Sequence, residues 1–264
     1  FMAQRAETEA ELRHLVWRLE NADTNEAASL MFQLQNHAEK ELQRTRETLA
    51  ELTRFVELLG GLQGRKIVFY VSDGLPGRPG EALFQAWANR FGEPGTVTPG
   101  ERGTDPSFQA VQADVSRSFS SLYSEAGGQG SFRDVVVRAN ANRVTLYTVD
   151  ASFASPSFAG VSADLAGASG GFGDVRTWDQ ATETMYRQDL TGSLSYLAEF
   201  TGGRKLPAND TLPRRMQEVR ESLAAAYQLA YEPPHVGDGK FHKIDVKVRK
   251  PGLQVRHREG YRDK

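Results

Sequence analysis

The residues of this chain whose types and position best suit ligand binding or catalysis are Ser72-Asp73-Gly74, which end the stretch GRKIVFYVSDG. They directly follow an apolar run, Ile67–Val71, and five apolar residues in a row are typical of a strand buried on both faces. Open α/β sheets bind their ligands at the carboxyl ends of the strands. Asp73 therefore has three possible roles there: a metal ligand, a catalytic group or a turn residue.

A second acid, Asp150, follows another stretch typical of a buried strand, VTLYTV at residues 144–149. Because ligands of open α/β sheets bind at one edge, we expect Asp150 and Asp73 to lie on that edge. Gly74 and Leu75 continue the chain from Asp73, and the long loops 92–106 and 151–176 are expected nearby. The candidate partner-binding residues are therefore Asp73, Gly74, Leu75 and Asp150.

Three short motifs match known signatures in letters but not in context. GGLQGRK, at 60–66, has the glycines and the lysine of a phosphate loop, but no Ser or Thr follows and its strand comes after it. GASGG, at 167–171, matches a nucleophile elbow but lies in a loop of small residues. NDT, at 209–211, matches a glycosylation acceptor and is explained equally well as a helix N-cap.

Catalytic side chains do not gather in any recognisable spacing. The chain has no cysteine, which excludes thiol catalysis, disulfides and Cys-based zinc sites. No two of its five histidines have ligand spacing on one helix. Neither Asp73, Asp150 nor Ser169 has a base and an orienting partner within motif spacing. We therefore predict that the chain is not an enzyme and has no catalytic residue.

Composition places the chain among ordinary globular proteins. It has 264 residues, of which 39% are hydrophobic and 25% charged, and its net charge is −2. This length suits one large domain or two small ones. The charge balance gives no reason to expect a nucleic-acid partner, and no apolar run approaches the ~20 residues of a membrane span.

Apolar periodicity and turn residues predict an alternation of helices and strands. Helices are expected at 3–20, 26–59, 81–91, 108–123, 131–142, 189–200 and 211–226. Strands are expected at 66–72, 144–149 and 227–231, followed by a hairpin of 244–248 and 253–257 around Pro251-Gly252. We predict an α/β fold with a helical segment 1–60, an α/β domain 61–232 and a basic antiparallel β-hairpin 233–264.

Several stretches resemble one known family. GRKIVFYVSDG resembles the fourth strand of a von Willebrand factor A-like domain, and the chain is similar to the A-related domain proteins of acidobacteria. The other matching stretches lie at 48–81, 144–151, 197–211 and 227–261, the last with DGKFHKI and PGLQVRHREGY. The resemblance covers about residues 40 to 261, with gaps.

This resemblance implies a Rossmann-like sheet flanked by helices, with a divalent ion such as Mg²⁺ at its edge. The family holds the ion with an Asp-x-Ser-x-Ser loop, a Thr from a second loop and an Asp after the fourth strand. Asp73 matches that Asp, with Ser72 beside it, and Thr24 in DTNEAA loosely matches the Thr loop. The Asp-x-Ser-x-Ser loop does not occur in this chain, so no cofactor is expected unless ligands come from elsewhere.

The resemblance further implies a non-enzymatic protein–protein interaction or adhesion module, located in the periplasm or at the cell surface. The alternative is a structural scaffold subunit of a larger assembly. In that case the acidic N-terminal helices and the basic C-terminal hairpin would dock on other subunits.

Overall fold

The computed structural model describes residues 2–91, 130–152, 178, 180–224, 240–249 and 260–262. The chain divides into two compact units. Unit 1 comprises Phe1–Thr45, Pro76–Ser121 and Pro156–Leu190, and unit 2 comprises Arg46–Leu75, Leu122–Ser155 and Thr191–Lys264. The predicted segments 1–60 and 61–232 each contribute residues to both units, and the predicted segment 233–264 lies within unit 2. The predicted boundaries themselves stay a prediction.

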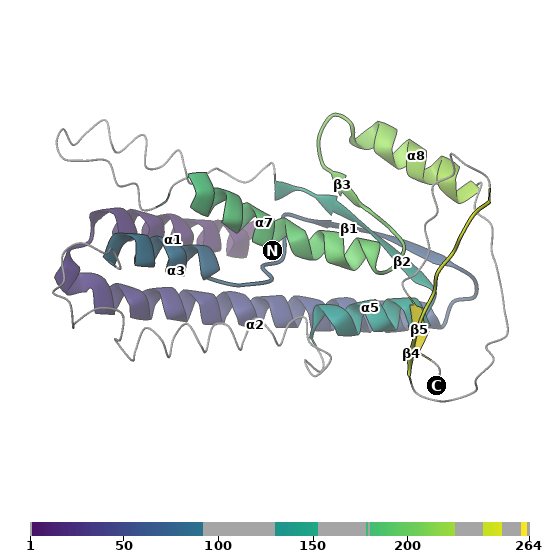
Figure 1. Ribbon diagram of the computed structural model, residues 1–264, viewed down its shortest axis with the longest axis horizontal. Helices are drawn as coiled ribbons and strands as arrows, with labels where there is room; N and C mark the ends of the chain where they lie inside the picture. The colour runs from purple at the N-terminus through teal and green to yellow at the C-terminus, as the bar shows by residue number, and fades with distance from the viewer. Residues whose placement is uncertain are drawn as a thin grey trace. The chain divides into compact units, whose positions relative to one another are not determined.

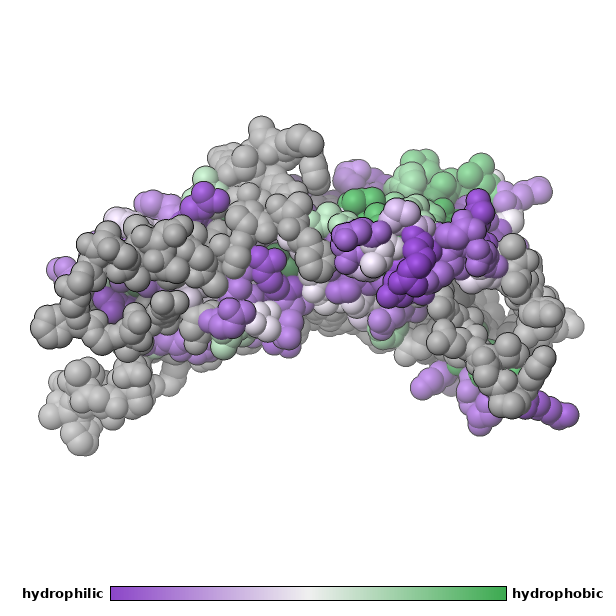
Figure 2. Space-filling view, turned by 90° about the horizontal axis from the view of Figure 1, so that it is seen from above, coloured by the Kyte–Doolittle hydropathy of each residue, from purple (hydrophilic) through white to green (hydrophobic). Residues whose placement is uncertain are grey.

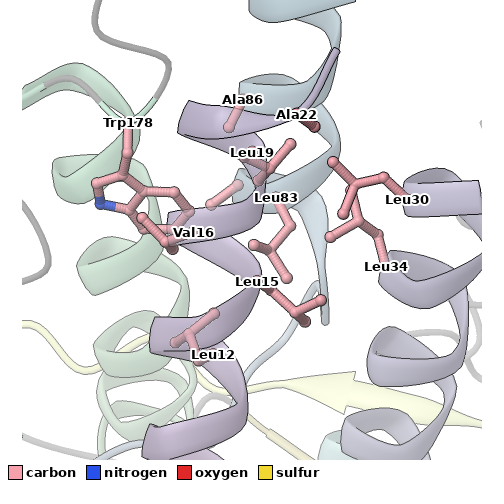
Figure 3. Packing of buried hydrophobic residues seen from close by; sticks show 11 residues of the cluster. Leu12, Leu15, Val16, Leu19, Ala22, Leu30, Leu34, Leu83, Ala86 and Trp178 are labelled. Atoms are coloured by element: carbon pink, nitrogen blue, oxygen red, sulfur yellow. The ribbon is translucent and has the colours of Figure 1, made fainter. Parts of the chain in front are cut away.

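Unit 1 is built from helices, which Figure 1 labels along the chain. They are α1 (Met2–Asn21), the short helix η1 (Thr24–Glu26), the first part of α2 (Ala27–Gly60), α3 (Glu81–Phe91) and the first part of α7 (Gln180–Glu199). The predicted helices at 3–20, 26–59 and 81–91 are confirmed. Figure 3 shows the core that they enclose, with residues of α1, α2 and α3 packed beside Trp178. Its largest fully buried side chains are Leu12, Leu19, Leu30, Leu34 and Trp178.

Unit 2 contains a three-stranded parallel sheet in the order β1-β2-β3 (Figure 1). The strands are β1 (Lys66–Ser72), β2 (Val144–Asp150) and β3 (Lys205–Pro207). The flanking helices are α5 (Phe132–Ala141), α8 (Leu212–Ala224) and the remaining parts of α2 and α7. A parallel sheet flanked by helices agrees with the predicted α/β class.

The prediction that β1 is buried on both faces is wrong. Among the described strands β1 pairs only with β2, so it is an outer strand of the described sheet. On one of its faces Phe69 is 39% and Val71 64% exposed. All seven residues of the central strand β2 are buried, as its sequence predicts.

One predicted element differs from the structure in extent, and one element of the structure was not predicted. The helix predicted at 189–200 begins earlier, at Gln180, and Met185 and Tyr186 in its first part pack against the core of unit 1. The three-residue strand β3 was not predicted, since it is shorter than the four to eight residues of a recognisable strand pattern.

The C-terminal pairing is antiparallel, but it lies outside the residues predicted for it. Strand β4 (Phe241–Lys243) pairs with β5 (Gly260–Arg262), in a register centred between residues 251 and 252. Residues 244–248, predicted as a strand, are not one. Within this stretch Ile244 and Val246 are partly buried and the residue between them is exposed, whereas Val248 at its end is 45% exposed.

Other predictions fall on residues outside the described part of the chain. They are the helix at 108–123, the loop 92–106, the strands at 227–231 and 253–257, the turn at Pro251-Gly252, and nearly all of the loop 151–176. None of the described helices combines the length and the apolar character that a bilayer crossing requires.

Candidate functional site

The candidate site is the edge of unit 2 where the parallel strands end, which we call the carboxyl edge (residues 72–75, 150–152 and 207–209). Strand register places Ser72 opposite Asp150, and Asp150 opposite Pro207. The backbone N–H of Ala151 donates to the Ser72 carbonyl at 2.8 Å, which extends the pairing past the strand ends. The predicted meeting of the first two strand ends at one edge is therefore present in the structure.

The turn after β1 is held by the Ser72 hydroxyl. Gly74 N–H donates to Ser72 Oγ at 3.1 Å, and this hydroxyl lies 3.2 Å from the Gly74 carbonyl. Gly74 has a φ of 130°, which an L side chain rarely adopts, so the turn requires a glycine. The Ser72 hydroxyl thus has a structural task, since it satisfies the turn through its own backbone.

Neighbouring groups fix the turn from both sides. The pKa of the Tyr70 phenol is raised by its burial and by the nearby Asp73 carboxylate, although its interaction with Ser72 lowers it. Leu75 is buried, and its carbonyl accepts a hydrogen bond of 2.5 Å from the hydroxyl of Ser193 on α7. Leu75 therefore anchors the end of the turn, while Asp73 and Gly74 are only partly buried.

Asp150 lies inside the carboxyl edge rather than on its surface. Its side chain is buried, with the residue 6% exposed, and Oδ1 accepts from the Ser152 N–H at 3.0 Å. Lys205 Nζ lies 3.6 Å from Oδ2. The carboxylate therefore has a cation and an N–H donor facing it, an arrangement that suits the support of the edge. Its predicted contact with a partner stays a prediction.

Two residues of this edge were missed by sequence reasoning, Lys205 and Ser193. Lys205 begins the strand β3, whose short pattern gave no signal, and it meets Asp150 only through the pairing of β2 with β3. Ser193 lies inside α7 at a position where no motif marks it. Thr24 lies in η1, within unit 1, and the prediction that it is a metal ligand stays untested.

The described donors do not fit a divalent ion such as Mg²⁺. That ion requires about six hard oxygen ligands in near-octahedral geometry. At the carboxyl edge the Ser72 hydroxyl is used by the Gly74 turn, and the ammonium of Lys205 faces Asp150. Among the described residues, no group of three or more His, Asp or Glu side chains is arranged to hold a metal.

We therefore expect this chain on its own to bind Mg²⁺ and Mn²⁺ only weakly. Isothermal titration of the purified chain with either ion should give no binding at micromolar concentration, because one carboxylate cannot replace the ion's hydration shell. An Asp73→Ala variant serves as the control. Micromolar binding by the wild-type chain that this variant loses would contradict the expectation.

Comparison with known proteins adds no further assignment. No protein-family model, no curated protein and no solved structure matches this chain.

Proposed function

We propose that unit 2 is a non-enzymatic protein-binding module of the von Willebrand A type. Its contact surface would combine the turn at Asp73 and Gly74 with the exposed face of β1. The observation that carries this proposal is that Val71 and Phe69, exposed by 64% and 39%, lie on the strand that ends at Asp73. An apolar strand face next to a carboxylate is a surface that a protein partner can cover.

The exposed apolar side chains of β1 lie on one face of the strand. Phe69 and Val71 are two residues apart, so they point to the same side of the strand. The Phe69 ring stacks on Tyr147 of β2, with ring centroids 5.5 Å apart, which restricts its rotation. On the face that Figure 2 draws, hydrophobic residues gather toward the right of the view, beside strongly hydrophilic ones. Exposed apolar patches rimmed by polar residues are typical of interaction sites.

An outer strand also offers its backbone to a partner. Within the described residues β1 hydrogen-bonds to β2 along one edge alone, so a partner's extended segment can add along the other edge. Such a segment would gain backbone hydrogen bonds from β1 and would bury Phe69 and Val71 under its own apolar side chains. Asp73 would then select a polar or cationic group at the end of that segment.

Several expectations from the resemblance belong to this proposal. In A-type domains a partner's carboxylate can complete the shell of a bound ion, and here this route needs further ligands from outside the described residues. Leu75 and Asp150 would act by holding the turn and the edge in place, since both are buried. Location outside the cytoplasm is part of the same proposal and rests on the resemblance.

Site-specific photo-crosslinking tests this proposal. A photoreactive amino acid is introduced at Val71 and, as a matched control, at Met216, which is 40% exposed on α8 in the same unit. We expect one discrete protein adduct from position 71 and none from position 216. The same adducts from both positions, or none from position 71, would contradict β1 as the contact surface.

A structural scaffold subunit is the second candidate, favoured by exposed apolar residues on α2. Phe55 and Leu58 are 45% and 77% exposed and lie three residues apart on one side of α2, and Leu62, just beyond the end of the helix, is 59% exposed. Light scattering during size-exclusion chromatography, at low and high salt, separates the candidates. A stable oligomer of this chain would favour the scaffold, and a monomer at both salt concentrations would favour the binding module.

A further inference from the structure

We propose that unit 1 holds the segment Pro76–Gly80 through a proton-dependent pair of acids, Glu41 on α2 and Asp189 on α7, so that the segment loosens as the pair loses its proton. This segment continues the chain from the carboxyl-edge turn at Asp73–Leu75. The inference that partner binding would follow the same protonation rests on the proposed function, whereas the anchor itself is a property of unit 1 alone.

Asp189 is the direct anchor of the segment. The backbone N–H of Arg78 donates to Asp189 Oδ1 at 2.8 Å, and the nearby backbone of Gly77 lowers the pKa of the same carboxyl group. The Arg78 hydrogen bond holds the backbone of the segment against α7. The segment also packs on α2, because a Cβ added at Gly80 would lie 2.6 Å from the Cβ of Ala38.

Glu41 lies close to this anchor. Glu41 and Asp189 line the same small cavity, together with Leu12, Arg78, Glu81 and Tyr186. Burial and the nearby Asp189 carboxylate raise the pKa of Glu41 to about 7, against the opposing charge of Arg44. Burial also raises the pKa of Asp189 to about 7, opposed by the N–H of Arg78 and reinforced by the Glu81 charge. Two acids in such a place disfavour being ionised together.

A buried histidine separates Glu41 from a further acid. His37 is 1% exposed, with Nδ1 3.6 Å from Glu11 Oε1 and Nε2 3.7 Å from Glu41 Oε1. Neither ring nitrogen makes a hydrogen bond within the described structure. Burial lowers the pKa of His37, although the Glu11 carboxylate raises it, so the imidazole is neutral near pH 7. It therefore supplies no positive charge to balance an ionised Glu41.

Other charged residues near Glu41 and Asp189 form ion pairs of their own. On α1, Glu11 pairs with Lys40 of α2 at 2.9 Å, and the pKa of Glu11 is lowered by Lys40 and His37 despite the opposing effect of burial. At the start of α3, Glu81 pairs with Arg78 at 3.1 Å. Arg44 on α2 is the cation that acts on Glu41 and on His37. Ionisation of both Glu41 and Asp189 therefore leaves two like charges close together.

The sign of the pH dependence follows from the raised pKa values. In the closed segment the pair keeps a proton up to about pH 7, whereas in the opened segment both acids return toward their ordinary values near 4. The closed state therefore binds more protons between about pH 4 and pH 7. Over that range each linked proton makes opening about tenfold easier per pH unit, and above about pH 7 the effect levels off.

Amide hydrogen exchange of the full chain, resolved at Gly77 and Arg78, tests the anchor. After correction for intrinsic exchange rates, we expect protection at these two amides to fall at least about tenfold from pH 5.5 to pH 7.5. A Glu41→Gln/Asp189→Asn variant keeps an acceptor oxygen at residue 189 and should lose this dependence, to below about twofold. The matched control Glu39→Gln alters an exposed acid on α2 and should behave as wild type.

Two results would overturn the proposal. One is equal protection of the wild-type chain at both pH values, and the other is a double variant that keeps the wild-type dependence. If the double variant fails to fold, carbon-13 titration of the Glu41 and Asp189 carboxyl groups in the wild-type chain decides. Ordinary values near 4 for both acids would refute the anchor. Absence of a partner adduct at Val71 would refute the proposed function and leave the anchor unaffected.

Discussion

Replacing Gly203 by alanine should lower the free energy of unfolding of unit 2 by about 3 kcal/mol or more. A Cβ at this position would lie 1.9 Å from the Leu146 carbonyl oxygen and 2.8 Å from its carbonyl carbon. These are backbone atoms of the central strand β2, which cannot move aside as the end of a flexible side chain can. The loop must therefore shift away from β2, and the start of β3 shifts with it.

The contacts around Gly203 explain why a shift is costly. The Gly203 N–H donates to the Ala198 carbonyl at 2.8 Å, and the Leu146 N–H donates to Thr201 Oγ1 at 3.0 Å. Thr201 and Leu146 are fully buried, so a displaced loop leaves buried polar groups without partners.

The matched control is Gly192→Ala on α7, where an added Cβ meets no heavy atom within 4 Å. Alanine in a helix interior is favoured over glycine by about 1 kcal/mol, so this control should keep or raise stability. Urea unfolding followed by circular dichroism measures both variants. Equal stability of Gly203→Ala and wild type would contradict the close approach of these two backbones.

Replacing Trp178 by alanine should lower the free energy of unfolding of unit 1 by about 3–5 kcal/mol. Trp178 is 1% exposed and packs in the core of α1, α2 and α3. Its indole N–H donates to Glu183 Oε2 at 2.9 Å, and its backbone N–H donates to Glu20 Oε1 at 3.0 Å. Truncation therefore leaves a large cavity and takes a donor from Glu183, which is 2% exposed.

Two further variants separate the contributions of Trp178. Trp178→Phe keeps most of the ring volume but loses the N–H, so it should cost about 1–3 kcal/mol. Trp17→Ala, at a tryptophan that is 41% exposed, is the matched control and should cost about 1 kcal/mol or less. Urea unfolding followed by far-ultraviolet circular dichroism avoids the loss of indole fluorescence. A Trp17→Ala effect equal to that of Trp178→Ala would contradict the assignment of the core.

Local sequence patterns were sufficient for the long elements. The stripe of Leu12, Leu15, Val16 and Leu19 predicts α1 and is buried in the structure. Leu42, Thr45, Leu49, Leu52, Val56 and Leu59 repeat at the spacing of one helix face, and in α2 the four middle residues are buried and the two outer ones partly buried. These predictions succeed because helical periodicity, and the strand patterns of β1 and β2, depend only on neighbouring residues of one segment.

Features that depend on which segments meet could not be predicted in the same way. The apolar run of β1 gives no information about its place in the sheet, and that place decides the exposure of Phe69 and Val71. The pairing of Asp150 with Lys205 requires the strand β3, which is too short to leave a pattern. Asp189 and Glu41 are far apart in the sequence and line the same small cavity in unit 1.

The central claim, that Val71 and Asp73 contact a protein partner, is tested most directly by calorimetric titration of the partner captured at position 71. The wild-type chain is compared with Val71→Lys, Asp73→Ala and the control Met216→Lys. We predict that Kd rises at least about tenfold for Val71→Lys and for Asp73→Ala, and less than about twofold for the control. Equal Kd values for all four proteins would contradict the claim.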